Sequence, residues 1–161
     1  MARRTLIPAL GLAAALLGGC SKEPLRVDTA PSRHHHHHAP HGGTPIELGE
    51  EEYHVELVLD EPSGNLQAYI LDAEMENFVR STAASIEIRA TVKGAEQKLV
   101  LVVVANAETG ETVGDTSLFE APAGWVRSTG SFDGVLSGVV IRGTNFGDVK
   151  FNFPKGNDTD G

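Results

Sequence analysis

Histidines are concentrated in one short stretch of this chain, and their imidazole nitrogens are the clearest candidates for metal coordination in the sequence. Six of the seven histidines fall within eight residues, namely His34, His35, His36, His37, His38 and His41. Neutral imidazole binds Zn²⁺, Cu²⁺ and Ni²⁺, and neighbouring histidines on a flexible segment can supply several nitrogens to one ion without a preformed cavity. The tract therefore predicts transition-metal binding of low selectivity. A pH-responsive polar spacer and a residual affinity tag are the alternative interpretations.

A second candidate metal site involves the one remaining histidine. His54 stands two residues before Glu56 in an alternating, strand-like segment, so both side chains point to the same side and can reach one ion. His41 precedes His54 by thirteen residues, and Gly42 and Gly43 allow the chain to turn back toward the strand. A surface histidine or a hydrogen-bonded structural histidine is the simpler interpretation of His54.

The sequence contains none of the patterns that indicate catalysis. No spacing links serine, histidine and aspartate as a hydrolytic triad, and no compact set of three ligands predicts a catalytic zinc. The later glycines do not lead into a helix, so they do not predict a phosphate-binding loop. We therefore expect a protein that is not an enzyme and has no obligatory cofactor.

Alternating apolar residues predict the elements that must position these histidines. All nine aromatic residues lie in residues 46–155, which is enough chain for one domain with its own core. Strand-like runs occupy residues 53–59, 65–71, 86–92, 98–105, 116–120, 125–127, 135–142 and 148–153. The turn cluster Pro62-Ser-Gly-Asn65 joins the first two runs, which predicts a hairpin over residues 53–71. Sustained helical periodicity is absent, and residues 72–79 suit either a helical turn or a loop between sheets. The pattern predicts an all-β fold, an antiparallel β-sandwich of about seven or eight strands, with an open barrel as the alternative.

Two of these strands carry specific predictions about their faces. In residues 53–59 the apolar side chains alternate with His54, Glu56 and Val58, which predicts a strand with one solvent-facing side. Residues 98–105 are apolar on both faces, which predicts a central strand that is covered on both sides.

The start of the chain has the layout of an export signal. Arg3 and Arg4 precede an apolar run over residues 6–17, and the small residues 18–20 follow. This run is shorter than the roughly 20 residues that a membrane-spanning helix needs, so we expect residues 1–19 to be removed as a signal peptide.

The tetrapeptide Leu17-Gly18-Gly19-Cys20 resembles the lipobox of bacterial lipoproteins. The resemblance implies that Cys20 is lipidated and becomes the new N-terminus, and that the protein is anchored to a membrane. Ser21, in place of aspartate, implies by the same resemblance an outer-membrane location that faces the periplasm. Residues 20–45 contain four prolines and no aromatic residue, which predicts a flexible tether, and residues 156–161 are predicted to be a disordered tail.

The charge balance excludes one class of partner and leaves another open. The formal net charge is −9, which argues against nucleic-acid binding through a basic surface. Between Arg33 and Arg80 the chain has no basic residue and ten acidic ones. A solvated face is the simplest interpretation of this run, although its field attracts cations.

Three segments carry a resemblance to a known group of proteins. These are Pro40-His-Gly-Gly43, Tyr53-His-Val-Glu-Leu-Val-Leu-Asp60 and Tyr69-Ile-Leu-Asp72. They resemble the small periplasmic β-domains found near, or fused to, the membrane-fusion adaptor subunits of heavy-metal efflux systems. The resemblance implies an envelope location, a role in copper, zinc, cobalt or nickel handling, and metal-binding positions at His41, His54, Glu56 and Asp72. Unlike the adaptors, this chain has no helical hairpin and no lipoyl-like domain, so it is not expected to act as a pump component by itself.

Two functional hypotheses follow from the sequence. The first is a lipid-anchored periplasmic β-sandwich that binds divalent transition metal ions without catalysis, as an accessory to metal handling or to an efflux adaptor. The second is a structural or protein-interaction lipoprotein of the envelope, in which an exposed sheet edge or acidic face docks a partner and the histidines only space the domain from the lipid.

Overall fold

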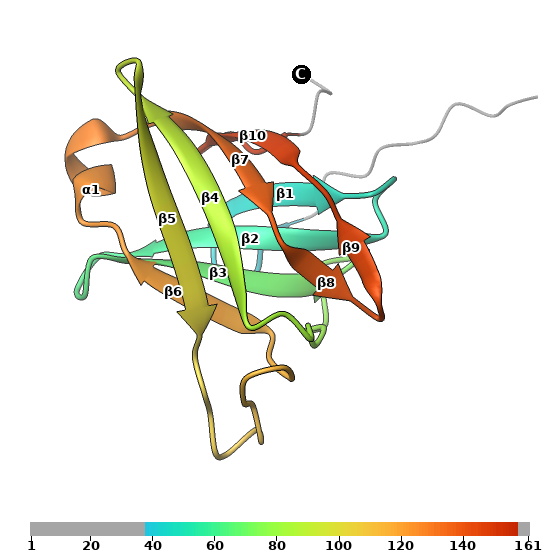
Figure 1. Ribbon diagram of the computed structural model, residues 1–161. Helices are drawn as coiled ribbons and strands as arrows, with labels where there is room; N and C mark the ends of the chain where they lie inside the picture. The colour runs from blue at the N-terminus through green and yellow to red at the C-terminus, as the bar shows by residue number, and fades with distance from the viewer. Residues whose placement is uncertain (1–37, 158–161) are drawn as a thin grey trace, which may run out of the picture. The chain divides into compact units, whose positions relative to one another are not determined.

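The computed structural model describes residues 38–157, which form one large antiparallel sheet, a two-stranded sheet and one helical turn (Figure 1). The large sheet has the strand order β1-β2-β3-β6-β5-β4-β7-β10. Its strands are β1 (Thr44–Leu48), β2 (Tyr53–Asp60), β3 (Asn65–Asp72), β4 (Ser85–Val92), β5 (Ala95–Val103), β6 (Leu118–Pro122), β7 (Phe132–Ser137) and β10 (Val149–Phe153). The small sheet pairs β8 (Val139–Ile141) with β9 (Thr144–Phe146), and the helical turn is α1 (Trp125–Thr129).

The large sheet nearly closes into a barrel, because its two end strands, β1 and β10, come into contact. The Asn157 side chain joins this seam: its Oδ1 accepts from the backbone N–H of Glu47 at 2.8 Å and its Nδ2 donates to the Glu47 carbonyl at 3.1 Å. Gly156 lies so close to β1 that a Cβ there would stand 2.2 Å from the Pro45 carbonyl oxygen. Gly156 and Asn157, which the sequence placed in a disordered tail, are therefore part of the fold.

The core fills the inside of this curved sheet. In β4 the residues Ile86, Ile88 and Ala90 are buried and alternate with more exposed neighbours, as the pattern of residues 86–92 predicts. Phe119 is the largest of the fully buried side chains. Gly134 is required on β7 because the Phe151 ring of β10 lies over it, and a Cβ would stand 2.5 Å from that ring.

The all-β, antiparallel fold predicted from the sequence is confirmed, and the large sheet approaches the open barrel that the sequence left as an alternative. The predicted hairpin over residues 53–71 is also correct, because β2 and β3 pair in antiparallel register from Tyr53↔Asp72 to Asp60↔Asn65. Of the two conformations considered for residues 72–79, the structure has a loop.

Other predictions about the elements are wrong. Residues 125–127 form the start of α1 rather than a strand, with Trp125 packed edge-on against Phe132 at 5.3 Å between ring centroids. The strands β1 and β9 were not predicted. The segment 98–105 is not covered on both sides, since Val100 and Val102 of β5 are 47% and 54% exposed.

Several sequence predictions concern residues outside the described part of the chain. These are the signal peptide, the lipidation of Cys20 and the histidines His34, His35, His36 and His37. Within residues 38–157, no helix has the length and apolar character needed to cross a membrane.

Candidate functional site

The site begins with the short segment 38–43, which precedes β1 and lies against the outer face of β2. Ala39 is buried, and it packs with Leu71 and Met75 in a small cluster separate from the main core. The backbone N–H of Gly42 donates to the Ala39 carbonyl at 3.0 Å, which turns the chain toward β2. This segment was assigned to the flexible tether by its composition, but it is built into the folded domain.

Glu56 of β2 holds segment 38–43 in place with both carboxylate oxygens. Its Oε1 accepts from the backbone N–H groups of His41 at 2.9 Å and of Gly43 at 2.8 Å. Its Oε2 lies 2.7 Å from Nδ1 of His41. The Glu56 side chain is fully buried, and a buried carboxylate is tolerated only when such donors replace its lost water.

Gly43 is the point of closest approach between segment 38–43 and β2. A Cβ at this position would stand 2.5 Å from the Leu57 carbonyl oxygen, 2.7 Å from Cγ2 of Val58 and 2.9 Å from Cγ of Glu56. Real Cβ atoms do not come this close to a backbone oxygen. A glycine is therefore needed for the N–H of residue 43 to reach Glu56.

The contact with Glu56 decides which ring nitrogen of His41 carries the proton. A carboxylate can only accept hydrogen bonds, so Nδ1 of His41 is the donor and the lone pair of the neutral ring lies on Nε2. A carboxylate–histidine pair of this kind orients imidazoles that bind metal ions through the other nitrogen. The imidazole side chain is 33% exposed, so solvent and ions reach it.

Two aromatic rings fix the plane of the His41 imidazole. The Tyr69 ring of β3 is stacked on it, with 4.0 Å between centroids and 16° between planes. Phe78, in the loop after β3, lies 5.9 Å from the His41 ring and 6.0 Å from the Tyr69 ring. The imidazole is thus restrained by a hydrogen bond at one edge and by stacking on its face.

Tyr69 experiences the negative charge of this region. Burial raises the pKa of Tyr69, and the carboxylates of Glu56, Asp60 and Glu120 raise it further. The hydroxyl donates a hydrogen bond to Oε1 of Gln67 at 2.9 Å. The outer face of β2, β3 and β6 therefore favours cations over anions.

His54 and Asp72, the other two positions singled out by the sequence, serve local structure. His54 is 1% exposed, and its Nδ1 lies 3.3 Å from the carbonyl oxygen of Asp72. The carboxylate of Asp72 turns away into its own loop, where it accepts from the backbone N–H groups of Glu76 and Asn77 and from the Asn77 side chain. Burial works to raise the pKa of Asp72, but these hydrogen bonds outweigh it and the pKa is lowered.

Residues 53–59 were predicted to have one solvent-facing side, and this prediction is wrong for His54 and Glu56, which are both buried. Segment 38–43 and the loop after β3 cover this side of the strand. Of the four positions His41, His54, Glu56 and Asp72, the structure pairs only His41 with Glu56 by side-chain contact. Across residues 38–157, no three His, Cys, Asp or Glu side chains are grouped closely enough to hold a metal ion. Any metal site here needs ligands in addition to His41.

A cleft with a volume of about 420 Å³ adjoins His41. It lies between segment 38–43, the end of β2, α1 and the end of β10, and His41, Thr44, Val58, Arg127 and Phe153 are among the residues that line it. The guanidinium of Arg127 is paired with Glu61 at 3.1 Å at its rim. The cleft leaves room beside His41 for a small ligand or for further side chains.

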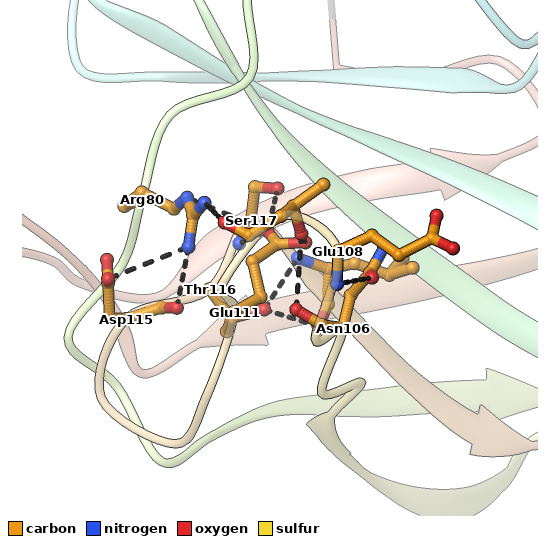
Figure 2. A network of polar contacts seen from close by, with 9 residues as sticks. Arg80, Asn106, Glu108, Glu111, Asp115, Thr116 and Ser117 are labelled. Atoms are coloured by element: carbon orange, nitrogen blue, oxygen red, sulfur yellow. Dashed lines mark hydrogen bonds and ion pairs between the residues drawn. The ribbon is translucent and has the colours of Figure 1, made fainter.

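A second polar cluster, around Arg80, shapes the long loop between β5 and β6 (Figure 2). The Arg80 guanidinium donates to the carbonyl oxygens of Thr109 at 2.8 Å and Asp115 at 3.0 Å, and it lies 3.8 Å from the carboxylate of Glu111. The carboxylate of Glu111 also accepts from the N–H of Ser117 at 2.9 Å and from the hydroxyl of Ser117 at 2.6 Å. These contacts stabilise the loop between β5 and β6, and this structural role accounts for the cluster.

The pKa of Glu111 reports how strongly the loop depends on its charge. Burial works to raise this pKa, but the hydrogen bonds from Ser117 and Thr109 and the charge of Arg80 outweigh it, so the pKa is lowered. The ionised form of Glu111 therefore stabilises the fold at neutral pH.

The sequence did not single out Tyr69 and Phe78 as parts of the site. The register of the hairpin would have found Tyr69, because the turn after Asp60 places Glu56 opposite Tyr69. Phe78 has no comparable signal, since the loop after β3 brings it to the site.

Comparisons with known proteins do not identify this site. The chain matches no family model, no curated protein and no solved structure.

Proposed function

We propose that this protein is a lipid-anchored periplasmic protein that binds divalent transition metal ions, Zn²⁺, Cu²⁺ or Ni²⁺, without catalysing a reaction. The observation that carries the proposal is the contact of Glu56 with Nδ1 of His41 at 2.7 Å, which leaves Nε2 as the metal-binding nitrogen. The location rests on the export signal and on the lipobox-like tetrapeptide that ends at Cys20. The resemblance to domains of metal-efflux systems points in the same direction.

In this proposal His41 is the ligand that the described fold positions, and the preceding tract supplies the others. His38 is exposed and stands three residues before His41, so the backbone between them spans at most about 10 Å. His34, His35, His36 and His37 continue the tract directly upstream. Because one ligand is held by Glu56 and by stacking on Tyr69, less conformational freedom is lost on binding than for a free histidine tract.

The same arrangement predicts the order of importance of the histidines. His54 is buried and engaged with the Asp72 carbonyl, so it contributes to folding and not to ion binding. Glu56 is a positioning residue, because it acts on the ion through the tautomer and basicity of His41. Substitution of such a partner typically lowers metal affinity by about 10- to 100-fold.

The test is calorimetric titration of the full chain, in detergent, with Zn²⁺, Cu²⁺ and Ni²⁺. We expect His41→Gln and replacement of the tract from His34 to His38 by glutamine each to weaken binding, and the combined variant to abolish it. The matched control is His54→Gln, which should leave the affinity unchanged. Binding that is unaffected by His41→Gln would reduce the proposal to the tract, and absence of binding by the parent chain would eliminate it.

Glu56→Gln separates positioning from simple structural support. The glutamine oxygen can still accept from the two backbone N–H groups, but its NH₂ must donate to Nδ1 of His41, which moves the ring proton to Nε2. We expect a folded variant with the opposite His41 tautomer in ¹⁵N NMR spectra and with metal affinity roughly 10- to 100-fold lower. An unchanged tautomer with unchanged affinity would contradict the assigned role of Glu56.

A further inference from the structure

The outer face of β5 breaks the rule that a solvent-facing sheet position is polar. Leu99 and Leu101 point into the core, while Val100 and Val102, on the opposite face, are 47% and 54% exposed. An antiparallel sheet with one wet face normally shows apolar residues inside and polar residues outside. The two valines that led to the prediction of a central strand therefore lie on a face of β5 that no other part of residues 38–157 covers.

The strand registers place these valines in a continuous surface. Val102 lies opposite Glu120 of β6, and Glu120 lies opposite Gln67 of β3. Gln67 in turn lies opposite Val58 of β2, so one row crosses four strands, over about 14 Å.

The adjoining row adds aromatic and aliphatic area to this surface. Leu118 of β6 lies opposite Tyr69 of β3, and the exposed ring of Phe78 lies 6.0 Å from the Tyr69 ring. We refer to the combined surface as the outer patch; it consists of Val58, Gln67, Tyr69, Phe78, Val100, Val102, Leu118 and Glu120. Exposed apolar side chains that gather in this way, with polar groups around them, mark interaction sites.

The charge around the outer patch is negative. Glu120 lies within it, and its carboxylate and that of Asp60 both act on the Tyr69 hydroxyl. The basic side chains on the adjoining strand positions are already engaged: Lys98 with Glu87 at 2.6 Å, and Arg89 with Asp148 at 2.8 Å. An incoming positive charge would meet acidic groups and exposed aromatic rings without displacing a cation of the domain.

We propose that the outer patch docks a segment of a partner protein that is rich in arginine or lysine and in aliphatic residues. The aliphatic side chains of such a segment would cover Val100 and Val102. Its cationic groups would pair with Glu120 and stack on the rings of Tyr69 and Phe78. This surface needs no metal ion, so the proposal goes beyond metal binding and stands independently of it.

The test uses a short labelled peptide that alternates arginine and valine, titrated with the full chain in the presence of EDTA. We expect binding that weakens as salt is added, and no binding of a peptide that alternates glutamate and valine. Val102→Ser and Glu120→Gln should each weaken binding several-fold, and the double variant should weaken it by roughly ten-fold or more. Because both side chains lie on the surface, thermal unfolding should show that the variants remain folded.

Matched controls come from the loop between β5 and β6. Val113 is an exposed valine and Glu108 an exposed glutamate outside the outer patch, so Val113→Ser and Glu108→Gln should leave peptide affinity unchanged. The titration is carried out in EDTA, so peptide binding that depends on Val102 and Glu120 is separated from the metal site.

Each of the following results would overturn the proposal. They are failure of the basic peptide to bind, equal binding of the acidic peptide, equal loss of binding in the control variants, and binding of anionic vesicles in place of the peptide. Self-association of the chain that is lost in Val102→Ser, without peptide binding, would likewise assign the outer patch to a second copy and refute a basic partner.

Discussion

Substitution of Gly43 by alanine should detach segment 38–43 from the sheet without unfolding the domain. The new Cβ would stand 2.5 to 2.9 Å from three atoms of β2, one of them the Leu57 carbonyl oxygen, which cannot move without disturbing the strand. Overpacking of this kind costs about 1–3 kcal/mol. The segment can relieve the clash only by lengthening the hydrogen bond from residue 43 to Glu56, which is itself worth about 1.5–3 kcal/mol because the acceptor is charged.

Amide hydrogen exchange measures this detachment directly. A loss of about 1–3 kcal/mol in the docking of the segment should speed exchange of the His41 N–H by roughly 5- to 150-fold, while amides in the centre of β4 remain protected. Gly147→Ala is the matched control, because a Cβ at Gly147 meets no atom within 4 Å. Unchanged His41 exchange in a folded Gly43→Ala protein would refute the view that this close approach holds the site together.

Three further predictions concern the stability of the fold. The folded-state pKa of Glu111 is lowered, so its contribution to stability is complete above the unfolded pKa of about 4.5 and is lost as the pH falls through the folded pKa. In urea titrations, the difference in unfolding free energy between the parent and Glu111→Gln should be largest at neutral pH and should shrink below about pH 4.5. A difference that does not depend on pH would contradict this. Asn157→Ala removes two hydrogen bonds from the seam and should cost about 1–3 kcal/mol in the same titrations, whereas Asn145→Ala on the exposed side of β9 should cost less than about 0.5 kcal/mol. Phe119→Ala empties the centre of the core and should cost about 3–5 kcal/mol in chemical denaturation, and a loss below about 1 kcal/mol would show that this side chain is not central to the packing.

Local patterns in the sequence were sufficient for the architecture. The alternation of Ile86, Ile88 and Ala90 predicts β4 and its buried face, and the turn after Asp60 predicts the β2–β3 hairpin. The helical turn at Trp125 was missed because five residues are too few to show helical periodicity. The type of an element can therefore be predicted where its apolar pattern extends over many residues, and not where the element is short.

The faces of the strands were harder to predict, because their burial depends on segments distant in the sequence. Glu56 was expected to face solvent, and it is buried because segment 38–43, thirteen to eighteen residues upstream, folds over it. Val100 and Val102 were expected to be covered, and they are exposed because no element of residues 38–157 lies over that side of β5. Alternation identifies which residues share a face but does not identify what covers it.

The candidate site was also predictable only in part. The residue types of His41, Gly43 and Glu56 were visible in the sequence. Gly42 and Gly43 left the chain free to turn back, and the structure has this turn. The direct contact of His41 with Glu56 was not predicted, because the sequence suggested both residues, together with His54, as ligands of one ion. The three-dimensional contact instead joins Glu56 to the incoming segment.

The ring nitrogens of His41 provide the most direct test of the central claim. In ¹⁵N NMR spectra of the metal-free full chain at mildly alkaline pH, where an ordinary imidazole is neutral, we predict that His41 carries its proton on Nδ1 and that Nε2 shifts when Zn²⁺ is added. A proton on Nε2, or an Nε2 resonance that stays in place while Zn²⁺ binds elsewhere on the chain, would contradict the account.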